Sequence, residues 1–155
     1  MDETIAERVR AAIGDRAIWL ALILEAFREA LPEGEVERLA RKAIFEYGRY
    51  KATKDPSPFS AKDLVLKFID SGSAKIFDSD IEWKEDGAEN RVHRCPLVDA
   101  WRGMGLDAKA LDLLCDIAME GDRGRAAAHG IEMDLQETIG RGDSFCRIGL
   151  SSNRG

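Results

Sequence analysis

Residues 131–150 read IEMDLQETIGRGDSFCRIGL, and this stretch decides the fold. Its first six residues alternate apolar and polar side chains, which is the pattern of a β-strand with one buried face. Gly140–Asp143 has the composition of a turn. Residues 145–150 alternate again, and one side of this second run is formed by Cys146, Ile148 and Leu150. The stretch therefore predicts two antiparallel strands joined by a turn.

A second hairpin is predicted earlier in the chain. Residues 77–83 alternate with period two, with Phe77 and Trp83 on the same side. Glu85–Ala88 has the composition of a turn, and residues 90–94 can return as the partner strand. The sheet is therefore expected to consist of two hairpin-like units.

Two helices are predicted between these hairpins. Pro96 suits the first position of a helix, with Cys95 as the cap residue. Asp107 can cap the next helix, whose apolar stripe includes Cys115. Residues 120–124, which read EGDRG, are expected to be irregular.

The N-terminal part of the chain has apolar residues at helical spacing. The predicted helices cover residues 3–13, residues 16–31, a segment from about residue 35, and residues 61–70. Gly14-Asp15 is expected to separate the first two helices. Ser60 and Asp63 have the spacing of a capping box at the start of the last one.

These elements predict an α+β fold, with a helical N-terminal half followed by a small antiparallel sheet and two helices inserted between its hairpins. We expect a single domain over residues 1–155, divided into a helical part (1–70) and an α+β part (74–150). A chain of 155 residues is long enough to bury a substantial core.

Composition limits the possible functions. The formal net charge is −6, which gives no overall electrostatic footprint for nucleic acid. The longest apolar run, residues 17–24, is too short to span a membrane. Three cysteines without a secretory signal argue against a disulfide framework. We expect a cytoplasmic protein with reduced thiols.

Cys95 is the first candidate for chemistry. A thiol at a helix N-terminus feels the positive end of the dipole, which lowers its pKa. His93 lies two residues earlier and would share a strand face with it. With Cys146, these residues would offer soft ligands for zinc. The alternative is that the cysteines are buried packing residues, and this interpretation is favoured for Cys115.

Other polar residues carry weaker signals. Asp116, Glu120 and Asp122 form an acidic cluster near the expected end of a helix, where carboxylates are disfavoured. His129 offers a base or a ligand, although a loop histidine is more often neither. The sequence contains no P-loop, GxGxxG, HExxH or GxSxG motif.

The C-terminal half resembles a known family. An ordered set of motifs lies between about Asn90 and Leu150, and it consists of Cys95–Trp101, Leu114–Asp116, Glu120–Gly124 and Glu137–Cys146. This set resembles the L-2-amino-thiazoline-4-carboxylic acid hydrolase family. The order and spacing of the cysteines are also similar, more loosely, to those of the 4-vinyl reductase domain, a module that binds small molecules.

The first resemblance implies hydrolytic opening of a thiazoline ring at its amidine carbon. We therefore expect a hydrolase of a C–N bond in a small cyclic amidine or amide, acting on a small-molecule substrate. The second resemblance implies a non-catalytic binding or sensor module instead. A homo-oligomer is compatible with either function.

The hydrolase hypothesis gives each candidate residue a role. Cys95 would be the nucleophile or a metal ligand, and His93 would orient it or share the metal. Asp143 or Asp116 would transfer protons. The substrate would be held by Arg147 and Trp101, and a divalent metal such as zinc or manganese would bind to Cys95, His93 and Cys146.

Overall fold

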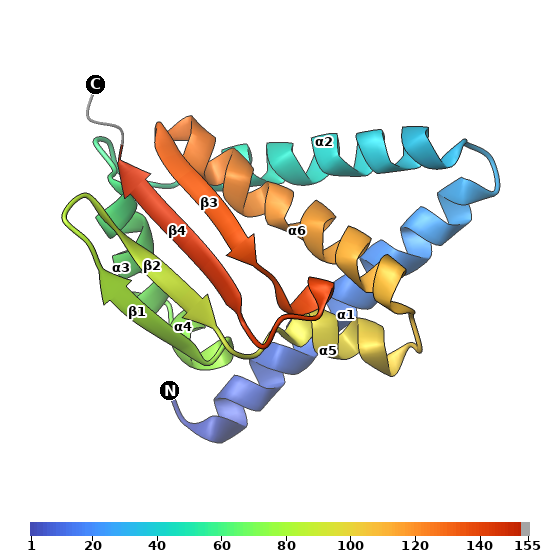
Figure 1. The fold of residues 1–155 in the computed structure, drawn as a ribbon, viewed down its shortest axis with the longest axis horizontal. Helices are drawn as coiled ribbons and strands as arrows, with labels where there is room; N and C mark the ends of the chain where they lie inside the picture. Colours follow the sequence, from blue (N-terminus) through green and yellow to red (C-terminus); the bar gives the residue numbers. More distant parts are fainter. Residues whose placement is uncertain (153–155) are drawn as a thin grey trace.

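The computed structural model describes residues 1–152, which form a helical layer and a four-stranded sheet (Figure 1). In chain order the elements are α1 (Glu3–Arg28), α2 (Glu33–Ala52), α3 (Ala61–Asp70), α4 (Ser73–Ile76), β1 (Ser79–Trp83), β2 (Gly87–Val92), α5 (Pro96–Gly103), α6 (Ala108–Ala128), β3 (Ile131–Glu137), the 3-10 turn η1 (Ile139–Arg141) and β4 (Cys146–Ser152). The predicted α+β class, with two helices between two hairpins, is confirmed. None of the helices in these residues is long and apolar enough to cross a membrane.

The sheet has the strand order β1-β2-β4-β3, and all neighbours are antiparallel. The two hairpins therefore lie side by side, with β2 next to β4, and Val92 pairs with Cys146. Both strands of the first hairpin differ from the prediction, since β1 begins at Ser79 instead of residue 77 and β2 covers Gly87–Val92 instead of residues 90–94. β1 begins at Ser79 because Asp78 has a positive φ of 49°. β2 begins at Gly87, where a side chain would collide with the backbone of β4.

Helix α1 is continuous, so the predicted break at Gly14-Asp15 is wrong. Gly14 is buried at the crossing of α1 and α5, where an added Cβ would lie 3.4 Å from the Cβ of Ala100. The indole N–H of Trp101 in α5 donates a hydrogen bond of 2.8 Å to the carbonyl of Ala17. Gly14 therefore allows two helices to approach rather than ending one.

Helix α6 runs through residues 120–124, which the sequence led us to expect as irregular. Its glycines face α2 at backbone contact distance. A Cβ at Gly124 would lie 2.1 Å from the carbonyl oxygen of Phe45, and one at Gly48 would lie 1.9 Å from that of Gly121. Glycines at this spacing let the helices come closer than side chains permit, and the helical backbone remains intact.

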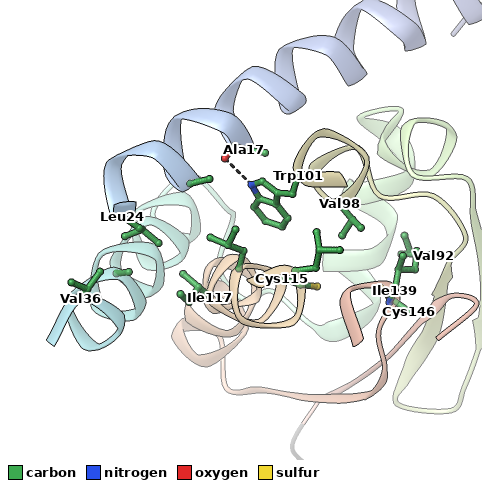
Figure 2. Close-up of a cluster of buried hydrophobic side chains, with 14 residues drawn as sticks. Ala17, Leu24, Val36, Val92, Val98, Trp101, Cys115, Ile117, Ile139 and Cys146 are labelled. Atoms are coloured by element: carbon green, nitrogen blue, oxygen red, sulfur yellow. Dashed lines mark hydrogen bonds between the residues drawn. The ribbon is translucent and has the colours of Figure 1, made fainter. Parts of the chain in front are cut away.

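One buried cluster links the helical layer to the sheet (Figure 2). The side chain of Trp101 has no exposed surface and sits between α1 and α6, within this cluster. The cluster continues to the ends of β2 and β4 through Val92 and Cys146. The two halves of the chain therefore share a core.

We predict that Gly124→Ala destabilises the protein by about 1–3 kcal/mol, because the new methyl group collides with the backbone of α2. Gly34→Ala is the matched control, since no atom lies within 4 Å of the position that its Cβ would take and the residue is helical. The control is expected to be neutral or to stabilise by about 0.4–1 kcal/mol. Urea denaturation of both variants measures the difference, and equal effects would contradict the close helix contact.

Candidate functional site

The three cysteines come together from three elements. Cys95 is the N-cap of α5, Cys115 lies in α6, and Cys146 is the first residue of β4. Cys115 and Cys146 belong to the buried core, and Cys95 packs against it. Cys115 lies within electrostatic reach of both other thiols. We call these three residues the cysteine cluster.

The turn between β3 and β4 holds two of these thiols in place. The N–H of Ile139 donates a hydrogen bond of 3.3 Å to Sγ of Cys146. Gly140 lies against Cys115, because a Cβ on this glycine would be 2.4 Å from the Cβ of Cys115. A larger residue at position 140 would therefore displace the turn from α6.

Asp143 and Thr138 close the same turn. Oδ2 of Asp143 accepts a hydrogen bond of 2.9 Å from the N–H of Thr138. Oγ1 of the buried Thr138 accepts one of 3.1 Å from the N–H of Arg141. Asp143 also contributes to the raised pKa of Cys146, so its carboxylate is within electrostatic reach of this thiol.

Burial keeps the thiols of the cysteine cluster protonated at neutral pH. It raises the pKa of Cys95 to about 11, although the backbone N–H groups of Val98 and Leu97 act in the opposite direction. It raises the pKa of Cys115 to about 12 and also raises that of Cys146. The expected lowering at the helix terminus is therefore outweighed, since desolvation disfavours the thiolate.

His93 does not join the cysteine cluster. Strand β2 ends at Val92, and the imidazole of His93 leaves the strand to bind Oδ2 of Asp80 at 2.7 Å. Its ring also contacts Phe145, with centroids 5.5 Å apart. Within residues 1–152 no group of three or more His, Cys, Asp or Glu side chains is arranged to hold a metal ion. The expected ligand set of His93, Cys95 and Cys146 is thus not assembled.

Asp116 belongs to an ion-pair network between α2 and α6. Its carboxylate binds Arg41 at 2.7 Å and Arg123 at 2.6 Å, and Glu120 binds the same two arginines. Burial would raise the pKa of Asp116, but the hydrogen bonds from Arg123 and Arg41 lower it overall. The acidic cluster does not lie at a helix end, because α6 continues to Ala128.

The two residues expected to bind substrate lie apart from each other. Trp101 is fully buried and is engaged with α1, so its indole serves the core. Arg147 lies on the other face of β4 from Cys146, 3.3 Å from a carboxylate oxygen of Glu137. Its guanidinium also lies over the ring of Phe145, at 5.5 Å.

His129 has a structural environment at the end of α6. Its Nε2 lies 3.0 Å from Oδ2 of Asp55, a carboxylate with no exposed side-chain surface. The Asp55 carboxylate also binds Arg125 and Lys67. The His129 ring packs against Phe59, with centroids 4.7 Å apart. This arrangement anchors the loop before α3 to α6.

The sequence interpretation missed Asn90. This residue is 7% exposed, and its Oδ1 has no hydrogen-bond partner within the described residues. It lies in β2 between Ile81 of β1 and Ile148 of β4, on the sheet face that also carries Val92. The buried oxygen of a nearby residue of β1, Ser79, is also unpaired. The sequence feature that could have identified Asn90 is its position on the buried side of an alternating strand, where an apolar residue is usual.

The fold and the cysteine cluster together define the class of this protein. It is an α+β protein whose cysteine cluster is built by a helix N-cap and a glycine-containing turn. The family model for L-2-amino-thiazoline-4-carboxylic acid hydrolase matches residues 10–150, so the chain belongs to this family. The first of the two resemblances noted in the sequence is therefore confirmed. A search of curated proteins found no match.

We predict that the cysteine cluster resists alkylation at neutral pH. Iodoacetamide should modify the native protein much more slowly than the urea-unfolded chain, because only the thiolate reacts and the folded pKa values of Cys95 and Cys115 are about 11 and 12. Peptide mass spectrometry after timed quenching measures each site. Rapid modification of native Cys95 would show that its thiol is activated after all.

The same pKa values predict a loss of stability at alkaline pH. The reference pKa of these thiols is 9.0, so the unfolded chain releases their protons first as the pH rises. The free energy of unfolding should therefore fall between about pH 9 and pH 12. Cys115→Ala should show a smaller alkaline decrease than the parent protein. An identical slope in both proteins would contradict the raised pKa of Cys115.

Proposed function

We propose that this protein hydrolyses a small cyclic amidine or amide at the cysteine cluster. One observation carries the proposal. The Cys95-Pro96 motif and the 137–146 motif, which are distant in sequence, meet around the same group of thiols. Membership of a hydrolase family supports a small-molecule substrate.

The reaction requires water to attack the amidine carbon and a ring atom to leave with a proton. We assign the acceptance of the proton from water to Oδ1 of Asp143, because Oδ2 is bound by Thr138. Cys95 acts as a neutral thiol that donates a proton to the leaving atom, since burial favours its protonated form. The proton held by Asp143 then returns to the thiolate of Cys95, and both residues are restored.

The leaving atom depends on the ring. In a cyclic amide or an all-nitrogen amidine it is nitrogen, and a C–N bond breaks. In a 2-amino-thiazoline, a product that keeps both nitrogens as a carbamoyl group requires the ring sulfur to leave as a thiol. The same proton transfer serves both reactions.

Asn90 is assigned a binding role in this proposal. Its unpaired Oδ1 would accept a hydrogen bond from a substrate N–H group. An unsatisfied buried acceptor costs free energy, and a ligand that supplies the donor removes this cost. His93 and Arg147 would contribute only if the substrate approached from the other sheet face, which makes them useful comparison positions.

The raised thiol pKa values favour a second candidate, a non-catalytic binding module of the 4-vinyl reductase type. A binder needs a buried polar pocket wall but no activated nucleophile. Calorimetry with 2-amino-thiazoline-4-carboxylate, followed by mass spectrometry of the ligand, separates the two functions. Binding with unaltered ligand would support the module and reject the hydrolase.

We predict that the protein releases a free thiol from 2-amino-thiazoline-4-carboxylate, detectable with a chromogenic disulfide. Cys95→Ala and Asp143→Asn should each lower kcat/KM by about 10²-fold or more, which is typical for loss of a proton-transfer group. Cys115→Ala is the matched control, with an expected cost of about 1 kcal/mol in stability and little change in turnover.

Variants on the other face of the sheet complete the test. His93→Ala and Arg147→Ala should retain activity if the substrate binds at the cysteine cluster. A large loss in these two variants, with full activity in Cys95→Ala, would place the reaction on the other face and contradict the proposal. Thermal melting of every variant identifies losses that come from unfolding.

A further inference from the structure

Helix α1 has a large apolar surface that no other element covers. The exposed fractions of its side chains are 72% for Trp19, 55% for Leu22, 47% for Ile23 and 51% for Phe27. Their spacing places them on one face of the helix, opposite the buried face that contacts α5. The hairpin of α1 and α2 projects away from the sheet (Figure 1). Exposed apolar patches of this kind mark interaction sites.

The N-terminal half of this exposed face of α1 has a shallow groove and charged side chains. A shallow groove of about 450 Å³ lies along α1 around Ala12, between the side chains of Arg8 and Arg16. Arg8, Asp15 and Arg16 form no ion pair within residues 1–152, whereas other charged residues of α1 are paired, namely Glu3, Glu7, Arg10, Glu25 and Arg28. Arg16 lies only within longer electrostatic reach of Asp122.

We propose that this face of α1 binds the α1 helix of a second copy of the chain in antiparallel orientation. A two-fold axis beside Asp15 and Arg16 places Asp15 of each copy next to Arg16 of the other. The same axis places Trp19 of each copy opposite the groove at Ala12 of the other. Leu22 then lies opposite Val9.

The surface is self-complementary in shape and charge, as an isologous dimer requires. The bulky indole of Trp19 meets the smallest residue of the groove, Ala12. The guanidinium groups of Arg8 and Arg16 flank that position, which suits cation–π contact with the indole. The overlap from residue 5 to residue 26 is about 33 Å of helix, long enough for a continuous interface. A parallel arrangement would lose the pairing of Asp15 with Arg16.

Charge reversal tests the axis directly. The wild-type protein should be dimeric in sedimentation velocity. Asp15→Arg gives each copy two adjacent arginines and Arg16→Asp gives each copy two adjacent aspartates, so each variant alone should dissociate at least tenfold more readily than the wild type. An equimolar mixture of the two variants should form a heterodimer, because the opposite charges then face each other.

Matched substitutions test the apolar contact. Trp19→Ala should weaken the dimer, whereas Trp83→Ala, at a 45% exposed tryptophan in β1, should not. Thermal melting controls for folding, since Arg16 lies within longer electrostatic reach of Asp122 in the same copy. A monomeric wild-type protein would overturn the proposal. A dimer that is unaffected by both charge reversals, or a mixture that does not associate, would overturn it as well.

Discussion

Helix α6 is held at backbone contact distance on two sides, and the rest of the structure depends on this constraint. On one side Gly124 meets the backbone of Phe45 in α2 and Gly48 of α2 meets the backbone of Gly121, so no side chain fits at Gly124 or Gly48. On the other side Cys115 meets Gly140 of the turn before β4. Because one rigid helix is fixed in both directions, the helical layer and the sheet take a single relative position. Ion pairs of Asp116 with Arg41 and Arg123 lie beside the contact between α6 and α2 and support it.

This packing also sets the chemistry of the cysteine cluster. The thiols lie where the helix N-cap, α6 and the turn converge. Cys115 and Cys146 are buried there, Cys95 is partly exposed, and desolvation raises the pKa of each thiol, so they stay protonated at neutral pH. A neutral thiol is a proton donor rather than a ready nucleophile, which is why the proposed mechanism uses water as the nucleophile. Asp143 serves the turn through one oxygen, and its second oxygen is assigned to the reaction. In this proposal the Cys95-Pro96 motif and the 137–146 motif hold the site in shape and also supply its reactive groups.

The two faces of the sheet have different characters. The face that meets the core carries Asn90 with an unpaired buried oxygen, next to apolar neighbours. The other face carries the charged pairs of Arg91 with Glu82 and of Arg147 with Glu137. A ligand that must be shielded from water would bind more favourably on the face that meets the core. The sequence interpretation expected His93 and Cys95 to share a strand face, but β2 ends at Val92 and His93 binds Asp80.

The sequence by itself determined the α+β class, the two hairpins and the two helices between them. Alternation in residues 131–150 and the capping residues Ser60 and Asp107 are local signals, and their physical effect is local as well. The motifs from Cys95 to Cys146 also determined the family. Only the tertiary structure decided what Gly14 and the glycines of α6 do, because a glycine can end a helix or admit a neighbour, and the choice depends on what lies beside it. It likewise decided the thiol pKa values and the partner of His93, since burial and strand ends depend on contacts between residues distant in the chain.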